Sequence, residues 1–289
     1  AGYAKRSIQS YAAALRRIQR FHPCLWQQEK RLEDITQEDL RQYWLACKAE
    51  FGWSAATLRI SYSAIKHFFT RTLVRPWPIL NQVHFKRDET LPTVLSTDEV
   101  RRILDALPTL QSRTFYVTLY SLGLRLQEAL TLQVGDILSD RGLVHIRAGK
   151  GGVDRVVPLP DVTLKALRRY YVTHRNPRWL FPALGHCNGK HARTAKTHAS
   201  TSAVQDVLRR TVKRLGMNKH VHPHVFRHSY ATHLIEANVP IRHVQKLLGH
   251  KTLQSTIVYL DVTTQAQTSS HRRVALSNNR ILSCEDHSV

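Results

Sequence analysis

A polar stretch punctuated by proline interrupts this chain of 289 residues after about one quarter of its length. Pro76 and Pro78 are followed by the polar run at 86–90 and then by Pro92. Proline fixes its own φ and has no backbone N–H, so neither a helix nor a central strand continues through such a stretch. The sequence therefore predicts three segments: a domain at 1–87, an extended linker at 88–95 and a second domain at 96–289.

The first segment is expected to form a compact helical unit. Apolar residues of its first helix recur at spacings of three and four, which places them on one stripe: Ile8, Tyr11, Leu15 and Ile18. A second helix is predicted to begin at Thr36, which forms a capping-box pair with Asp39, and a third begins near Ser54. We interpret the aromatic residues of these helices as core and not as platforms for stacked bases.

The second domain is predicted to combine helices with a small antiparallel sheet. A helix begins at the capping box of Ser96 and Glu99, and residues 114–122 are apolar enough for a buried helix. Strands at 143–148 and 155–159 flank a glycine-rich turn, which is typical of a β-hairpin. Later segments are predicted as helices at 161–174, 202–215, 224–237 and 241–248, and as a flexible loop at 182–200. The expected fold class is mostly α with a small antiparallel sheet.

The charge of the chain points to a polyanionic partner. Lys and Arg number 43 against 21 Asp and Glu, and the sequence pI is near 10.4. The surplus is about +7 over residues 1–95 and about +15 over residues 96–289, so it is not confined to a tail. Nucleic acid is the commonest polyanion that such a protein meets. A ribosome-associated or merely basic protein is the plainer alternative.

The cysteines and the apolar segments bear on the compartment. The four cysteines are scattered and form no close pairs, so we expect a reducing compartment without a disulfide framework. No apolar run approaches the ~20 residues that cross a bilayer, and no signal-peptide pattern is present. We therefore expect a cytoplasmic protein with no membrane partner.

Four short segments carry the residues of chemical interest. They contain Arg125 and Glu128; Lys150 in the glycine-rich turn; His224, Arg227 and His228; and His250 with Tyr259 nine positions later. Each has an ordinary explanation when taken alone. Arg125 and Glu128 fit a helical ion pair, a turn lysine is usually solvated, and a tyrosine between apolar neighbours is often half-buried.

Together, these residue types suit metal-free attack on a phosphodiester. Two arginines present planar donors to the non-bridging oxygens, where negative charge develops in the transition state. A phenol with a pKa of about 10 is a weak nucleophile, so it needs a proton acceptor or a strongly positive site. A lysine can protonate the leaving alkoxide.

The motifs resemble those of the tyrosine recombinase, or phage integrase, family, of the Xer-like and integrase-like kind. The matching strings are Leu122–Arg125, Gly149–Lys150–Gly151, His224-x-x-Arg227–His228 and Leu248–Gly249–His250 with Tyr259, and they occur in that family's order. The resemblance implies a helical, SAM-like core-binding domain that binds DNA, followed by the recombinase catalytic domain. It also implies a site-specific recombinase of the integrase or transposase type, encoded by a mobile genetic element.

The resemblance assigns roles to individual residues. Tyr259 would form a 3′-phosphotyrosyl link, Arg125 and Arg227 would hold the phosphate oxygens, and Lys150 would protonate the departing 5′-oxygen. His224 would assist proton transfer at the nucleophile, and His250 would donate a hydrogen bond to the phosphate. Glu128 would orient Arg125, and His228 would give structural support.

The family also implies partners. We expect double-stranded DNA with specific recombination sites, a homotetramer on paired sites and association with a bacterial nucleoid. We expect no cofactor, no metal, no ATP and no small-molecule substrate.

Three other functions are alternatives to this one. A zinc site would draw on His186, Cys187, His191 and His198, or on the histidines at 222–233, but neither group has a familiar ligand spacing. A recombinase-derived DNA-binding protein without catalysis is a second alternative, although loss of activity usually removes one of the six residues expected to react. A type IB topoisomerase-like enzyme would relax DNA without defined sites.

Overall fold

The computed structural model describes residues 5–25, 31–75, 77–78, 80, 92–147, 154–184 and 191–260. The chain forms two compact units, residues 1–90 and 91–289. Residues 88–91 of the predicted linker lie outside the described residues, so the boundaries of the linker stay a prediction. None of the described helices is both long enough and apolar enough to cross a membrane.

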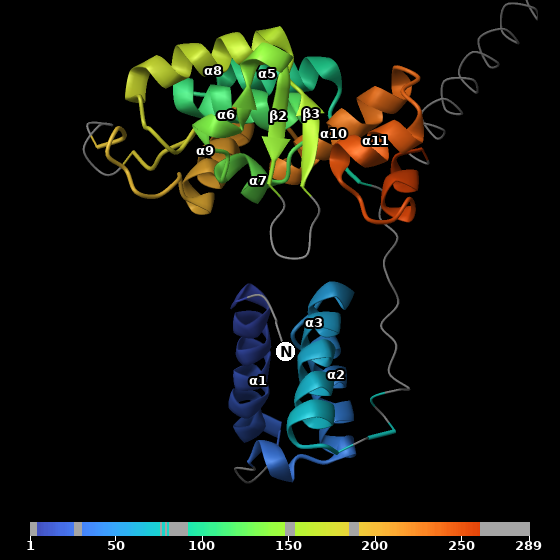
Figure 1. Ribbon diagram of the computed structural model, residues 1–289. Coiled ribbons are helices and arrows are strands. Elements are labelled where there is room, and N and C mark those ends of the chain that lie inside the picture. Colours follow the sequence, from blue (N-terminus) through green and yellow to red (C-terminus); the bar gives the residue numbers. More distant parts are fainter. Residues whose placement is uncertain are drawn as a thin grey trace, which may run out of the picture. The chain divides into compact units, whose positions relative to one another are not determined.

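The first unit is helical, as Figure 1 shows. Its elements are α1 (Lys5–Leu25), η1 (Leu32–Asp34), α2 (Gln37–Ala49), α3 (Ala55–His67) and the π-helical turn η2 (Phe68–Thr72). The predicted capping box at the start of α2 is confirmed: Asp39 N donates to Thr36 Oγ1 at 3.2 Å, and Thr36 N donates to Asp39 Oδ2 at 2.8 Å. Ser54 caps α3 through Thr57 N.

The core of this unit is aromatic. Tyr43, Trp44 and Phe69 are buried and pack with Ile18 and Ile65, so their interpretation as core residues is confirmed. Ile8 was predicted to share one apolar stripe with Ile18. That prediction is wrong, because the Ile8 side chain is 56% exposed. At 3.6 residues per turn, Ile8 lies about 80° around the helix from Ile18, at the edge of the stripe.

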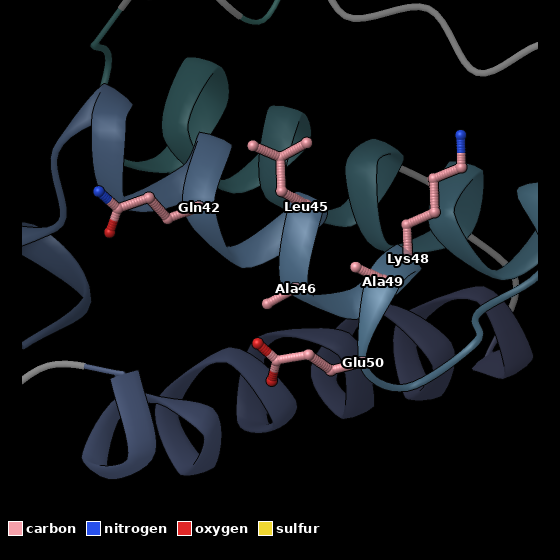
Figure 2. A pocket seen from close by; sticks show the side chains of 6 residues that line it. All are labelled: Gln42, Leu45, Ala46, Lys48, Ala49 and Glu50. Atoms are coloured by element: carbon pink, nitrogen blue, oxygen red, sulfur yellow. The ribbon is translucent and has the colours of Figure 1, made fainter.

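A hollow lies along α2. Its lining comes from a single helix and its C-cap: Gln42, Leu45, Ala46, Lys48, Ala49 and Glu50 (Figure 2). Leu45 is 59% exposed, and the lining includes one lysine and one glutamate. The hollow contains none of the residues predicted to act on a phosphodiester.

The second unit places helices around a three-stranded antiparallel sheet of order β1-β2-β3 (Figure 1). Its strands are β1 (Ile137–Leu138), β2 (Leu143–Ile146) and β3 (Arg155–Pro158). Its longer helices are α5 (Thr97–Ala106), α6 (Leu110–Ser121), α7 (Leu126–Leu130), α8 (Asp161–His174), α9 (Thr201–Arg214), α10 (Pro223–Glu236) and α11 (Ile241–Leu248). The short turns are η3 (Val134–Asp136) and η4 (Ser139–Arg141). Together with the helical first unit, this confirms the predicted fold class.

The predicted hairpin is confirmed where it is described. Strands β2 and β3 pair in an antiparallel register that sets Val144 opposite Val157. Residues 148–153 between them, which include Lys150, lie outside the described residues. The sequence did not predict β1, because a strand of two residues has no periodicity of its own and exists only by pairing with β2.

The stretch at 182–200 differs from the flexible loop that was predicted. Residues 185–190 lie outside the described part, but 191–199 are fixed by the buried Asn176. Its Nδ2 donates to the carbonyls of Ala192, Arg193 and Ala195, and its Oδ1 accepts from the backbone at 178 and 179. A bridge between Pro182 and His198 closes the segment. Sequence alone gives no sign of these long-range bonds.

The end of the predicted linker is part of the second unit. Leu95 is fully buried, its N–H donates to Ser229 Oγ at 2.9 Å, and its carbonyl lies 2.9 Å from His233 Nε2. The other nitrogen of His233 bonds to the Tyr120 hydroxyl. The chain therefore enters this unit fixed to α6 and α10.

The C-terminal part of the described chain packs on α10. Ala231, Val244, Leu248 and Tyr259 form a small buried cluster that joins α10, α11 and the helical turn at 254–260. This packing brings Tyr259 next to the helix that carries Arg227 and His228.

Candidate active site

Glu128 lies at the centre of a cluster of arginines. Arg125 is the N-cap of α7, and Glu128 is the third residue of that helix, so the short helix holds the two side chains together. Arg125 Nη1 donates to Glu128 Oε1 at 2.8 Å, and Arg125 N donates to Oε2 at 2.8 Å. Burial alone would raise the pKa of Glu128, but Arg155 and then Arg125 lower it to about 2.

Arg155, at the start of β3, is a site residue that the sequence analysis missed. Its Nη1 and Nη2 donate to the two oxygens of Glu128 at 3.0 and 2.8 Å, and its Nε donates to Leu247 O at 2.8 Å. Its side chain is only 9% exposed. The only feature of the sequence that pointed to Arg155 was its charge at the start of an otherwise apolar strand. That feature does not indicate a contact with Glu128, 27 positions earlier in the chain.

Arg227 is fixed by the ends of two helices. Its Nη1 donates to Gly123 O at 2.7 Å, and its Nη2 donates to Leu248 O at 2.5 Å. These carbonyls lie at the C-terminal ends of α6 and α11, where helix carbonyls lack partners within the helix and carry partial negative charge. Burial, and then the charge of Arg125, lower the pKa of Arg227 to about 10, so it stays cationic at neutral pH.

Two glycines make these carbonyls available. Gly123 and Gly249 have φ of +58° and +63°, a left-handed conformation that terminates each helix. A Cβ on Gly123 would lie 2.4 Å from Tyr230 Cδ1, and one on Gly249 would lie 3.0 Å from Arg155 Cδ. The carbonyl of Gly249 also accepts from Arg125 Nη2 at 3.4 Å.

Tyr259 lies beside this cationic cluster and is only 4% exposed. Its hydroxyl is 2.9 Å from His228 Nδ1, and the ring of His250 lies almost parallel to it at 6.3 Å between centroids. Burial raises the pKa of Tyr259, whereas the charges of Arg227 and Arg125 oppose that rise. Tyr259 and the two predicted arginines therefore belong to one site.

The three histidines occupy different places in the site. His250 Nδ1 is 2.9 Å from the buried Thr256 Oγ1, which fixes the ring, and burial followed by the charges of Arg227 and Arg125 lower its pKa to about 4. His224 is exposed, and burial of part of its ring, followed by the same two arginines, lowers its pKa. His228 makes the contact to Tyr259.

The proposed general acid and part of the alternative zinc site lie outside the described residues. Lys150 lies outside the described residues, as do His186 and Cys187 of the alternative zinc site. Within the described ranges, no group of three or more His, Cys, Asp or Glu side chains is arranged to hold a metal ion.

Comparisons with known proteins agree with the motifs. Residues 93–266 match the phage integrase family, and residues 1–79 match the phage integrase N-terminal SAM-like domain. A putative integrase/recombinase, y4qK, of Sinorhizobium fredii is 36% identical over 80% of this chain and 72% of its own length. The tyrosine recombinase XerA of Pyrococcus horikoshii is 31% identical over 82% of this chain and 79% of its own.

Solved structures show the same fold. A lambda integrase dimer bound to a COC′ core site matches 89% of this chain and 72% of its own, with a TM-score of 0.71 and 18% identity. The XerH site-specific recombinase bound to its difH substrate matches 90% of this chain and 78% of its own, with a TM-score of 0.66 and 21% identity. The chain belongs to the phage integrase family, the tyrosine recombinases.

Proposed function

We propose that this chain is a site-specific DNA recombinase in which Tyr259 attacks a backbone phosphate and forms a 3′-phosphotyrosyl link. The observation that carries the proposal is the position of the Tyr259 hydroxyl. It is buried in the site that contains Arg125 and Arg227, and the charges of both arginines act on its pKa. A nucleophile and its phosphate-binding groups need this proximity.

The charge of the site suits an anionic substrate. Three guanidinium groups, those of Arg125, Arg155 and Arg227, surround the single carboxylate of Glu128. The lowered pKa values of His228 and His250 leave both rings neutral at pH 7. The described part of the site therefore has a surplus of two positive charges, which a phosphodiester and the charge that develops during attack would balance.

The two predicted phosphate-binding arginines differ in freedom. Arg227 has a side chain that is 4% exposed and is bound by two carbonyls, so its donors are set in place before DNA arrives. The side chain of Arg125 is 42% exposed and can turn toward a substrate. Donors that are placed in advance stabilise the transition state without reorganisation.

Lys150 is proposed as the general acid for the leaving 5′-oxygen. Its position in the sequence is between β2 and β3, and Arg155 fixes the start of β3 to Glu128. Lysine gives up a proton more readily than arginine, whose pKa exceeds about 12. His250 is proposed to donate to the phosphate, and His224, exposed near the arginines, to assist proton transfer during attack.

The proposed partner is double-stranded DNA that carries specific recombination sites, and the proposed assembly is a homotetramer on paired sites. Exchange between two duplexes cuts four strands, and each cut uses one tyrosine, so four protomers complete the reaction. The lambda integrase structure named above contains a dimer on a core site, which is half of such an assembly.

The test is covalent capture on a nicked suicide duplex in excess EDTA and without ATP. The wild-type chain should form a protein–DNA adduct, whereas Tyr259→Phe should bind the duplex and form none. Tyr171→Phe is the matched control, because Tyr171 is a half-buried tyrosine on α8 and should leave the yield unchanged. An adduct with Tyr259→Phe would exclude Tyr259 as the nucleophile. Relaxation of supercoiled DNA without defined sites would favour a topoisomerase.

A further inference from the structure

The hydroxyl of the proposed nucleophile contacts a histidine that the motif assigns to structural support. We propose that His228 is a further catalytic residue, which takes the proton of the Tyr259 hydroxyl during cleavage and returns it during rejoining. This inference rests on the proposed function of Tyr259, and it moves the proton acceptor from His224 to His228.

The geometry separates His224 from His228, the two histidines of α10 that belong to the motif. His228 Nδ1 lies 2.9 Å from the Tyr259 oxygen, and the two rings are 5.6 Å apart between centroids. His224, one helical turn earlier, is exposed, and its ring neighbours that of His222 at 6.1 Å. A proton acceptor must lie within about 2.6–3.2 Å of the atom that it deprotonates. His228 meets this requirement in the described structure.

The helix presents adjacent residues to two parts of the reaction. Successive residues on an α-helix point about 100° apart. Arg227 is bound to Gly123 and Leu248 on the phosphate-binding side, and His228, the next residue, is directed to the nucleophile. One rigid element thus sets the distance between the charge-stabilising group and the proton acceptor.

The neutral charge state of His228 allows its ring to accept the proton of the Tyr259 hydroxyl. Burial, followed by the charges of His224, His222 and Arg227, lowers its pKa to about 4, so the ring is neutral at pH 7. The ring of His250 lies 6.3 Å from that of Tyr259 between centroids, and burial, followed by the charges of Arg227 and Arg125, keeps it neutral at pH 7. In the tautomer with hydrogen on Nε2, Nδ1 has a free lone pair, and the Tyr259 hydroxyl donates to it.

Cleavage moves one proton away from the nucleophile and one proton onto the leaving group. The Tyr259 O–H bond breaks and its proton passes to Nδ1, while the tyrosine oxygen bonds to phosphorus. The bond from phosphorus to the 5′-oxygen breaks, and that oxygen takes a proton from Lys150. The incoming phosphate carries the negative charge that stabilises the imidazolium ion. In rejoining, the oxygen of the 5′-hydroxyl bonds to phosphorus and its proton returns to Lys150, while the phosphorus–tyrosine bond breaks and Nδ1–H gives its proton back to the tyrosine oxygen.

The first measurement is the rate of adduct formation at saturating DNA. His228→Ala should react roughly 10²–10⁴ times more slowly, which is the usual loss for one acid–base group. Its rate should rise with pH as the phenol ionises, whereas the wild-type rate should not. His228→Asn retains a hydrogen-bonding group near Nδ1 but takes no proton, so it should stay slow. His243→Ala, an exposed histidine on α11, is the control and should match the wild type.

One further variant and one modified substrate separate a proton acceptor from a structural support. Replacement of Tyr259 by a fluorinated, more acidic tyrosine should restore much of the rate to His228→Ala, because that phenol ionises without help. A 5′-bridging phosphorothiolate, whose leaving group needs no proton, should rescue Lys150→Ala and not His228→Ala.

The outcomes distinguish this inference from the proposed function. If wild type forms an adduct and His228→Ala forms it equally fast, the inference fails and Tyr259 remains the nucleophile. If His228→Asn restores the rate, or if the acidic tyrosine gives no rescue, His228 positions the ring without taking the proton, and the inference also fails. If wild-type protein forms no adduct through Tyr259, the proposed function itself fails.

Discussion

At the scale of a single residue, Glu128 shows which contacts the spacing of residues in the sequence predicts and which it does not. Its spacing from Arg125 predicted a pair on one helix, and the 2.8 Å contact confirms that pair. The same spacing did not predict the two bonds from Arg155, because a hairpin and 27 positions of chain separate the partners. Local spacing identifies neighbours within one turn, whereas partners across a fold depend on packing that the sequence does not display.

The ion pairs of Glu128 make the stability of the fold depend on pH. The folded pKa of about 2 lies below the ordinary value of 4.5, so ionised Glu128 stabilises the fold above about pH 4.5 and loses this effect as the pH falls toward 2. Glu128→Gln should therefore lower the free energy of unfolding by about 3 kcal/mol at pH 7. The difference from wild type should shrink toward zero near pH 2.

Urea unfolding at a series of pH values measures this difference directly. Glu38→Gln, on the exposed face of α2, removes a carboxylate without a guanidinium cluster and is the control. A difference between Glu128→Gln and wild type that is constant from neutral to acidic pH would contradict the assignment of Arg155 and Arg125 as the cause.

At the scale of elements, the sequence predicted what local chemistry determines. The capping boxes at Thr36 and Ser96 place the starts of α2 and α5, because the bonds that form them join residues three positions apart. Strand β1 and the segment at 191–199 were missed or misjudged, because each is held by distant partners. Elements with internal signals are predictable, whereas elements that exist by pairing are not.

Asn176 offers a test of this distinction. Its amide is buried and serves five backbone groups, so Asn176→Ala would leave buried carbonyls and N–H groups without partners. The amides of residues 191–199 should then exchange hydrogen faster by at least tenfold, which corresponds to about 1.4 kcal/mol of lost local stability. Hydrogen exchange followed by mass spectrometry measures it. Asn218→Ala, at an exposed position before α10, is the control and should leave the exchange rates of 191–199 unchanged. If Asn176→Ala also left those rates unchanged, other contacts would hold the segment.

At the scale of the whole molecule, the order of the motifs predicted the family, because the same residue types must converge on one phosphate. The sequence did not show which histidine contacts Tyr259, since His224 and His228 belong to one motif and are only four positions apart. The orientation of α10 against the turn at 254–260 decides that question. Spacing along the chain thus gave the members of the site, and packing gave their contacts.

Charge is also a property of the whole chain, and it predicts how the two units share DNA binding. The first unit presents exposed cations that include Arg16, Arg41 and Arg71, and it contains none of the residues proposed to react. The second unit contains the residues proposed to react and most of the surplus charge. A fragment of the second unit has to include Leu95, since its backbone bonds to Ser229 and its side chain is fully buried.

Residues 91–289 alone should therefore fold and form the adduct slowly, but they should bind a recombination site far more weakly than the whole chain. Each phosphate that a cation neutralises steepens the plot of log affinity against log salt by about 0.9. Loss of the first unit removes phosphate contacts, so the fragment should give a shallower slope as well as a lower affinity. Fluorescence anisotropy with one labelled duplex at several salt concentrations measures both quantities for both proteins. Equal affinity and equal slope would show that the first unit takes no part in holding the DNA.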